Sequence, residues 1–366
     1  MRLRRRVLSG LVALCALALL GTACEAANPS ATDTRATGTA GTAPANAAAG
    51  AKDTASLSGA GSTFVQSMLQ EWIKQYARVA PGVSINYQGV GSGAGIQQLT
   101  SKTVDFAGSD VALKAGEKAA TGGPGAVVAV PWVAGGIAVE YNLAKVKSLK
   151  LSPDTVAGIF SGRIAKWNDA AIKADNPGAP LPKVGIQVVH RSDGSGTTQV
   201  FTSYLKAAAA PGRWNFPTDK DWHAPAGTGA KGSDGVTQAV KQSPGAIGYA
   251  DVSFPKLSSL GMVEIRNQAG QFVAPTAAGV TAALAEATPK DDGSLTMNYT
   301  PTAPTAYPIS TTTYLLFARA GDPTKTQALR HFAQWALTDG QNLTESLDYA
   351  PLPPPIVTAA LASVSV

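Results

Sequence analysis

Nine residues from His190 to Thr198 combine one arginine, four hydroxyl side chains and two glycines. Arg191 offers a planar fork of donors, Ser195 and Thr197 offer hydroxyls, and the glycines allow backbone N–H groups to approach a ligand closely. The following residues, Thr198–Leu205, have the pattern of a helix, whose first N–H groups would point to the same place. The segment is typical of an oxyanion site, and a Ser/Gly-rich turn explains it equally well.

Two strand–glycine–helix units lie near the start of the folded part. In the first, a short strand breaks at glycines before Thr63, and apolar residues then recur at helical spacing from Val65 to Tyr76. The second repeats this design and places Ser92 at the corresponding position. A third buried strand ends at Asp110. Because the carboxyl ends of parallel strands meet at one edge of a sheet, we expect these side chains and the arginine loop to share a polar crevice.

Four segments with this chemistry occur in order along the chain: Gly59–Phe64, Tyr87–Gly93, Asp105–Asp110 and Arg191–Thr197. Together they resemble the ligand segments of the phosphate-binding protein of the Pst ABC importer, the PstS family, and the match runs from about residue 57 to the 349–353 tail. The resemblance implies an α/β, two-lobed periplasmic-binding-protein fold of type II. It also implies mixed sheets flanked by helices and a hinged cleft.

The resemblance implies the following phosphate-binding residues: Thr63, Phe64, Ser92, Asp110, Arg191, Ser195, Gly196 and Thr197. Thr63 and Phe64 would donate through backbone N–H groups, and the hydroxyls of Thr63 and Ser92 would also contact the anion. Arg191 would supply the one formal positive charge, and the three residues that begin at Ser195 would form a second nest of donors. Asp110 would accept a proton from the ligand. Asp193, two residues after Arg191, is expected to clamp the guanidinium and to neutralise part of its charge.

Asp110 is an unexpected residue type for an anion site, because a carboxylate repels a fully ionised ligand. Its presence is explained if the ligand carries a proton, as phosphate does at neutral pH and sulfate does not. A site that demands a hydroxyl can reject an analogue without one by about 10⁴ to 10⁵. The alternative interpretation is that Asp110 caps a turn after its strand.

The first 23 residues have the features of a secretory signal peptide. A basic start from Arg2 to Arg6 precedes an apolar stretch from Val7 to Leu20, which is too short for a membrane span. The small residues before Cys24 resemble a bacterial lipoprotein box, although Gly21 stands where a leucine is usual. We expect Cys24 to carry the lipid anchor, palmitate included; the alternative is ordinary cleavage after an Ala-rich site.

Residues 24–56 continue as an Ala/Thr/Gly-rich linker with few large apolar side chains. Such a composition does not offset the entropy of ordering, so we expect a flexible tether with a span of roughly 30 Å. A tolerated low-complexity insertion is the alternative. Beyond it, we predict that residues 57–134 and 307–366 form lobe I and residues 135–300 form lobe II. The chain would cross between the lobes near residues 132–136 and again at 301–306, with the tryptophans in the core or at its rim.

Composition excludes several classes of function. The chain has 366 residues, 45% of them hydrophobic, and a formal charge of +6 that falls to about +2 without the arginines of the leader. No basic patch remains to indicate nucleic-acid binding. Both cysteines, Cys15 and Cys24, lie in the leader region, and the three histidines lack metal-ligand spacing. We therefore expect no metal and no cofactor.

The sequence thus predicts an extracytoplasmic protein that is held at the cell membrane by a lipid anchor. It would capture inorganic phosphate as a monomer and deliver it to the permease subunits of an ABC importer with their ATPase. One alternative is an enzyme, a phosphatase or serine hydrolase, but Asp193 and Val90 interrupt both Gly-x-Ser-x-Gly patterns. His190 would serve as a base only if it faced Ser195. The other alternative is a carrier of sulfate or molybdate.

Overall fold

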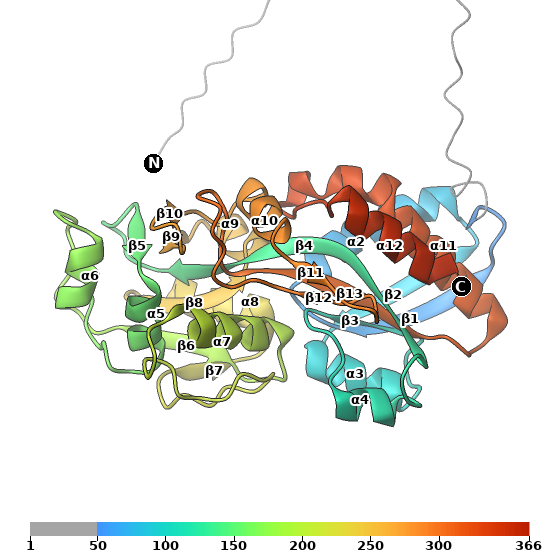
Figure 1. Ribbon diagram of the computed structural model, residues 1–366, viewed down its shortest axis with the longest axis horizontal. Coiled ribbons are helices and arrows are strands. Elements are labelled where there is room, and N and C mark those ends of the chain that lie inside the picture. Colours follow the sequence, from blue (N-terminus) through green and yellow to red (C-terminus); the bar gives the residue numbers. More distant parts are fainter. Residues whose placement is uncertain (1–49, 366) are drawn as a thin grey trace, which may run out of the picture. The chain divides into compact units, whose positions relative to one another are not determined.

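The computed structural model describes residues 50–365 (Figure 1). The predicted signal peptide, the predicted lipidation site Cys24 and the predicted linker up to residue 49 lie outside the described residues. The first strand, β1 (Ala55–Gly61), begins inside the predicted linker. The reason is backbone pairing, because β1 runs parallel to β2 (Val83–Gly89) along its whole length. Just before it, the Asp53 carboxylate and Nδ1 of His331 form a hydrogen bond of 2.6 Å, which fixes the start of the body.

All described strands except β11 and β12 belong to one continuous mixed sheet, whose main path has the order β2-β1-β3-β13-β4-β8-β6-β7. The further members of this path are β3 (Phe106–Ser109), β4 (Val127–Tyr141), β6 (Gln187–Arg191), β7 (Thr228–Ala230), β8 (Ala246–Asp251) and β13 (Ser310–Ala318). Strand β9 (Gly261–Arg266) branches from β4 and also pairs with β5 (Leu149–Leu151) and β10 (Phe272–Val273). The α/β class with mixed strands is confirmed.

Strand β4 joins the two halves of this sheet. Its first part pairs with β13 as far as Gly136, and its second part, from Ile137, pairs with β8. The first predicted crossing falls at this change of partner. The hairpin of β11 (Thr288–Pro289) and β12 (Leu295–Thr296) was assigned to lobe II, yet the Leu295 N–H donates to the Tyr314 hydroxyl of β13 at 3.0 Å. The division into lobes stays a prediction.

Most helices begin at a side-chain cap or a proline that the sequence provides. Ser195 caps α7 by accepting from the Thr198 N–H, and Ser152 and Asp322 cap helices that have proline in the first turn. The helices are α2 (Gln66–Val79), α3 (Ser92–Thr100), α4 (Ala115–Ala120), α5 (Pro153–Phe160), α6 (Ala170–Asp175), α7 (Gly196–Ala208), α8 (Gly232–Gln242), α9 (Ser253–Leu257), α10 (Ala277–Leu284), α11 (Pro323–Leu337) and α12 (Pro354–Ser365). Two 3₁₀ turns, Asp339–Leu343 and Glu345–Leu347, follow α11.

Helices cover both faces of the sheet half that contains β1–β3. In Figure 1, α2, α11 and α12 lie on one side of these strands, and α3 and α4 lie on the other. The core between them is aromatic: the rings of Trp72 and Trp132 meet edge to face at 5.5 Å. In the other half, α7 and α8 pack on β8. Of the tryptophans predicted for the core or its rim, Trp222 is half-buried and the others are buried.

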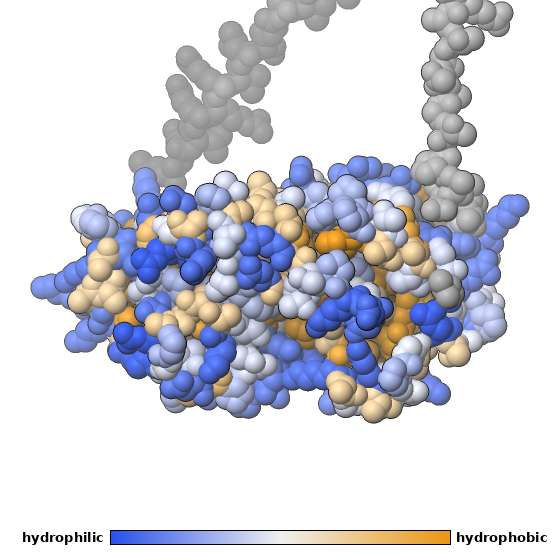
Figure 2. Space-filling view, viewed as in Figure 1, coloured by the Kyte–Doolittle hydropathy of each residue, from blue (hydrophilic) through white to orange (hydrophobic). Residues whose placement is uncertain are grey.

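The described surface is mixed in character. Figure 2 shows hydrophilic and hydrophobic residues interspersed on one face. Among residues 50–365, Val184 and Leu257 are the large hydrophobic side chains that are exposed. None of the helices in that range combines the length and the apolar character that a membrane crossing needs.

Candidate functional site

Three parallel strand ends bring the polar residues of the first half of the site together. Gly61 of β1 pairs with Gly89 of β2 and with Gly108 of β3, so the residues that follow each strand leave the same edge of the sheet. These residues include Thr63, Ser92 and Asp110, which are all at most 3% exposed. The crevice predicted from the strand ends is therefore present, although β13 adds an antiparallel neighbour to this edge.

Glycine is required at the second of these turns. Gly91 has a φ of 89°, in the left-handed region that side chains rarely adopt. A Cβ atom at this position would also lie 2.3 Å from Oδ2 of Asp193. The bare backbone thus lets the second half of the site approach the first. The approach continues two residues later, where the Gly93 N–H donates to the Gly194 carbonyl at 2.8 Å.

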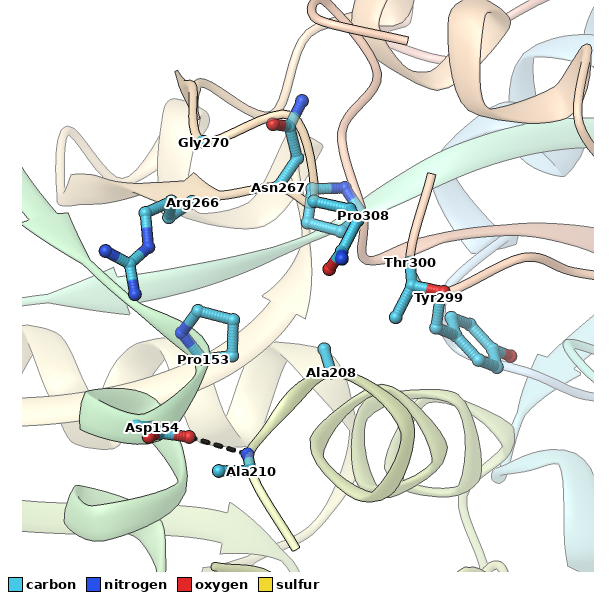
Figure 3. A pocket seen from close by; sticks show the side chains of 11 residues that line it. Pro153, Asp154, Ala208, Ala210, Arg266, Asn267, Gly270, Tyr299, Thr300 and Pro308 are labelled. Carbon is cyan, nitrogen blue, oxygen red and sulfur yellow. Dashed lines mark hydrogen bonds between the residues drawn. The ribbon is translucent and has the colours of Figure 1, made fainter. Parts of the chain in front are cut away.

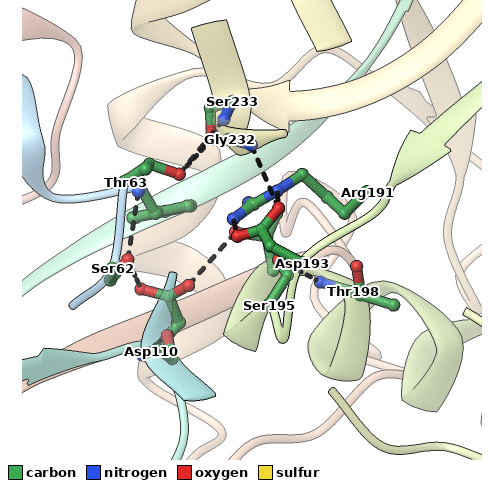
Figure 4. Close-up of polar contacts among 12 residues, drawn as sticks. Ser62, Thr63, Asp110, Arg191, Asp193, Ser195, Thr198, Gly232 and Ser233 are labelled. Atoms are coloured by element: carbon green, nitrogen blue, oxygen red, sulfur yellow. Dashed lines mark hydrogen bonds and ion pairs between the residues drawn. The ribbon is translucent and has the colours of Figure 1, made fainter. Parts of the chain in front are cut away.

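Asp110 is surrounded by hydroxyl and backbone groups (Figure 4). Ser62 donates its hydroxyl to Oδ1, and Thr197 donates its hydroxyl to Oδ2 at 3.1 Å. The backbone N–H of Asp110 donates to the Ser92 hydroxyl at 3.3 Å. Burial raises the pKa of Asp110, while the hydrogen bond from Ser62 and the positive charge of Arg191 oppose this rise. Both oxygens of the carboxylate therefore accept hydrogen bonds, in a site that is shielded from water.

Arg191 stands at the end of β6 and is 2% exposed. Its Nε donates to Oδ1 of Asp193 at 2.7 Å, and its second guanidinium nitrogen donates to Oδ2, so the clamp expected from the sequence is formed. Asp193 also accepts from the Gly232 N–H at 3.0 Å. Burial raises the pKa of Asp193, but the hydrogen bonds and charge of Arg191 outweigh it and hold this pKa below its ordinary value.

The start of α7 completes the second half. Gly196 and Thr197 are its first two residues, and helix geometry leaves their N–H groups without intrahelical acceptors. A Cβ atom on Gly196 would lie 2.6 Å from the Ser92 hydroxyl and 2.8 Å from Oδ2 of Asp110, so glycine permits this contact between the halves. Ser195 donates its own N–H to the Lys220 carbonyl at 2.9 Å. The start of α7 thus lies against the Ser92 hydroxyl and the Asp110 carboxylate of the first half.

The structure brings all eight predicted ligand residues into one cluster. Phe64 joins it through its backbone: its N–H donates to the Ser62 hydroxyl at 3.0 Å, while its ring is buried against Tyr349. The role of each residue toward an anion stays a prediction.

Sequence reasoning missed several neighbours of the cluster. Ser233 is not among the predicted ligand residues, but its N–H donates to the Thr63 hydroxyl at 3.1 Å, and the two hydroxyls are 3.0 Å apart. The signal that could have found it is the Gly232–Gly235 stretch, which has the same small and hydroxyl-bearing composition as the predicted loops. Ser62 was given no role, although it contacts Asp110 directly.

The groups needed for hydrolysis are not arranged for it. His190 stacks on Trp222 with the ring centres 5.0 Å apart, and its Nδ1 contacts the Arg191 carbonyl at 2.9 Å. The Ser195 hydroxyl instead accepts from the Thr198 N–H at 3.1 Å. Within residues 50–365, no group of three or more His, Cys, Asp and Glu side chains is arranged to hold a metal ion.

Two cavities help to place the site within the molecule. One of about 460 Å³ is lined by Arg266, Asn267 and Thr300 among others (Figure 3), and it includes none of the predicted ligand residues. Another of about 250 Å³ reaches Asp110 and is also lined by Gln199 and Thr311. Asp110 is thus next to a cavity, in addition to its contacts with the cluster.

Known proteins resemble this chain over most of its length. Residues 46–340 match the model of the PBP superfamily domain. The phosphate-binding protein PstS3 of Mycobacterium bovis is 38% identical, with 86% of this chain and 87% of that protein covered. The phosphate-binding protein PstS of Xylella fastidiosa is 36% identical, with 82% of each covered.

A solved structure agrees with these relatives. A high-affinity periplasmic phosphate-binding protein with bound phosphate superimposes with a TM-score of 0.68 and 25% identity, covering 84% of this chain and 93% of that one. The resemblance inferred from the four ligand segments is confirmed by comparisons that extend over the whole folded part. The chain belongs to the PstS family of phosphate-binding proteins, within the PBP superfamily.

Proposed function

We propose that this protein captures inorganic phosphate outside the cytoplasm and delivers it to the permease of an ABC importer. The observation that carries the proposal is Asp110, a carboxylate that is 1% exposed and faces the start of α7 in a cluster of donors. An acceptor at this place repels an anion that has no proton. It favours one that can donate an O–H, as monohydrogen phosphate does.

The charges of the cluster support binding through hydrogen bonds rather than through net charge. Arg191 is already paired with Asp193, so the guanidinium alone does not neutralise a doubly charged ligand. The remaining stabilisation must come from hydroxyls and helix-start N–H groups. Hydrogen bonds to a charged group contribute about 1.5 to 3 kcal/mol each. Several of them exceed the roughly 8 kcal/mol that corresponds to micromolar affinity, before the cost of ordering.

The two halves of the cluster come from strand ends far apart in the chain, which suits a ligand that is gripped by both. Thr63 and Ser233 are 170 residues apart and share two contacts. An anion between the halves would make its full set of contacts only when they meet, so binding would favour the closed arrangement.

The remaining features of the proposal concern location and partners. The signal peptide of residues 1–23, the lipid on Cys24 and the linker would export the protein and tether it to the cell membrane. The folded body would act as a monomer and would dock on the permease subunits, whose ATPase drives transport. It would need no cofactor. The PstS family is a family of binding proteins for transport rather than of enzymes, which supports this assignment over a hydrolase.

The direct test is a calorimetric titration of the purified protein with phosphate, sulfate and molybdate. We expect phosphate to bind with micromolar or tighter affinity and the other two anions to bind at least about 10³-fold more weakly. Equal binding of sulfate would favour a carrier of another oxyanion.

A turnover assay with a chromogenic phosphate ester tests the alternative that the protein is a phosphatase or serine hydrolase. The wild type and Ser195→Ala are compared, and Ser195-dependent turnover would reject the proposal.

A further inference from the structure

Ser62 is held in place by every polar group that it has. Its N–H donates to the Gly108 carbonyl at 2.9 Å, and its own carbonyl accepts from the Tyr87 hydroxyl at 2.9 Å. The residue is 1% exposed and follows the last residue of β1. Its side chain therefore leaves a rigid backbone toward the cluster.

The Ser62 hydroxyl accepts one hydrogen bond and donates another. A hydroxyl has one proton to donate, and the Phe64 N–H can only donate, so the Ser62 oxygen accepts from Phe64. The proton of Ser62 is then available for Oδ1 of Asp110, with which it forms a hydrogen bond. In this contact Oδ1 accepts from Ser62, and Oδ2 accepts from the Thr197 hydroxyl. Both oxygens of the carboxylate thus meet donors, which favours the ionised form.

We propose that Ser62 is a positioning residue for anion selection. Its hydroxyl holds Asp110 as a hydrogen-bond acceptor within the cluster of predicted ligand residues. The inference rests on the proposed function and deepens it, because it assigns the choice between protonated and unprotonated oxyanions to a pair of residues. The contact with Phe64 does not prevent the Phe64 N–H from reaching an anion, since one N–H can be shared between two acceptors.

The electrostatics around Asp110 agree with this role. Burial raises the pKa of Asp110, and the hydrogen bond from Ser62 is the largest effect that opposes the rise. Several other charged or titratable groups interact electrostatically with this carboxyl: Arg191 with its partner Asp193, Tyr87 on β2, Asp251 on β8, and Tyr349. Two lysines, Lys114 and Lys290, line the adjacent cavity. None of these groups takes the place of Ser62 on Oδ1.

Removal of the Ser62 hydroxyl should change which anion is preferred. Without this donor, Asp110 would take up a proton at a higher pH. A protonated Asp110 donates a hydrogen bond instead of accepting one. The site could then bind sulfate, because the ligand would no longer need to supply an O–H group. Selection for phosphate should then weaken, and it should weaken further as the pH falls. A merely structural role in the turn before α2 would lower stability without this dependence on pH.

The test compares Ser62→Ala with Ser62→Thr, which keeps the hydroxyl, and with Ser109→Ala as a matched control. Ser109 is a buried serine beside Asp110, but its hydroxyl donates to the Val111 carbonyl instead of to the carboxylate. The dissociation constants for inorganic phosphate and for sulfate are measured by calorimetry at pH 6, 7 and 8 on the exported protein with its linker. Thermal unfolding establishes that each variant is folded.

We expect Ser62→Ala to lower the ratio of the sulfate to the phosphate dissociation constant about tenfold at pH 7, and by more at pH 6. Ser62→Thr should restore the ratio, and Ser109→Ala should leave it unchanged. A ratio in Ser62→Ala that equals the wild-type ratio at all three values of pH overturns the inference alone. A wild-type protein that binds neither anion, or binds both equally, rejects the proposed function and this inference with it.

Discussion

The two halves of the site contribute unlike charges. The first half, at the ends of β1–β3, supplies hydroxyls and the carboxylate of Asp110, and no described cation lies among them. The second half, at the end of β6 and the start of α7, supplies Arg191, which is already paired with Asp193. The first half can therefore test for a proton on the ligand, while the second half can provide most of the attraction.

This difference separates affinity from selectivity. A change in the second half should weaken all oxyanions together, because it removes donors that any of them would use. A change at Asp110 or at Ser62 should instead alter the order of preference among anions. The comparison is open to experiment, since each half can be changed without the other.

The largest effect is expected for Arg191→Ala. The change removes the only cation of the cluster and leaves Asp193, whose side chain is 12% exposed, beside the anion without its partner, so phosphate affinity should fall by about 10³-fold or more. The fold should remain, and sulfate should weaken to a similar extent. Calorimetry with both anions measures this. The double variant Arg191→Ala, Asp193→Asn should recover part of the loss. An affinity close to that of the wild type would show that the anion binds elsewhere.

Asp110→Asn should change selectivity more than affinity. Asparagine keeps the shape of the side chain and adds an N–H donor, so sulfate would gain a hydrogen bond in place of a repulsion. We expect the ratio of the sulfate to the phosphate dissociation constant to fall by about 10² or more. The same two titrations give this ratio. An unchanged ratio would mean that the first half of the site does not distinguish a protonated oxyanion from an unprotonated one.

The same division marks what the sequence could predict. Thr63, Ser92 and Asp110 were found because each follows a short strand at glycines, a local pattern that a single sequence shows. Ser233 and Lys220 were missed because their partners, Thr63 and Glu117, lie more than 100 residues away. Such contacts depend on how the halves of the sheet are placed, and a local pattern contains no information on that placement.

The strand order was also outside the reach of pattern reasoning. Strand β13 lies between β3 and β4, a place in the sheet that the predicted return of residues 307–366 to lobe I does not specify. All residues of β13 except the last are buried, and this pattern is common to any strand that is covered on both faces. It therefore does not indicate which strands are the neighbours of β13. Its position is fixed by tertiary packing, including the bond from the Trp132 indole to the Thr313 hydroxyl at 2.7 Å.

A smaller effect is expected where the halves touch outside the anion cluster. Lys220 pairs with Glu117 of α4 at 2.5 Å, and the Lys220 side chain is 9% exposed. The Lys220 carbonyl also accepts from the Ser195 N–H, so the pair is linked to the start of α7. Glu117→Gln removes the charge of the pair and should weaken phosphate and sulfate equally, by about three- to tenfold, through a faster release of the anion.

Stopped-flow measurement of the rate of phosphate release tests this prediction. Glu71→Gln is the matched control, because Glu71 pairs with Lys74 on the surface of α2 at 3.2 Å and touches neither half of the site. It should leave the rate of release unchanged. If Glu117→Gln alters the preference between the two anions instead, the contact belongs to the selective half of the site, and the separation of roles is wrong.

The smallest effect on binding is expected at Glu140, a buried carboxyl of β4 that contrasts with Asp110. Among the described residues Thr237 alone donates to it, at 3.0 and 3.1 Å, and burial raises the pKa of Glu140 to about 8. In the unfolded chain this pKa is near its ordinary 4.5. The folded state therefore holds the proton more tightly, and stability should fall as the pH rises from about 4.5 to 8.

Glu140→Gln removes this loss. We expect the variant to match the wild type near pH 4.5 and to be more stable at pH 8, by about 2 kcal/mol or more in the free energy of unfolding. Denaturant titrations at both values of pH measure the difference, with the less buried Glu264→Gln of β9 as a control. Phosphate selectivity should not change. A difference that is the same at both values of pH would show that Glu140 is ionised in the fold, and that a single hydroxyl donor is enough to keep a buried carboxylate charged in this protein.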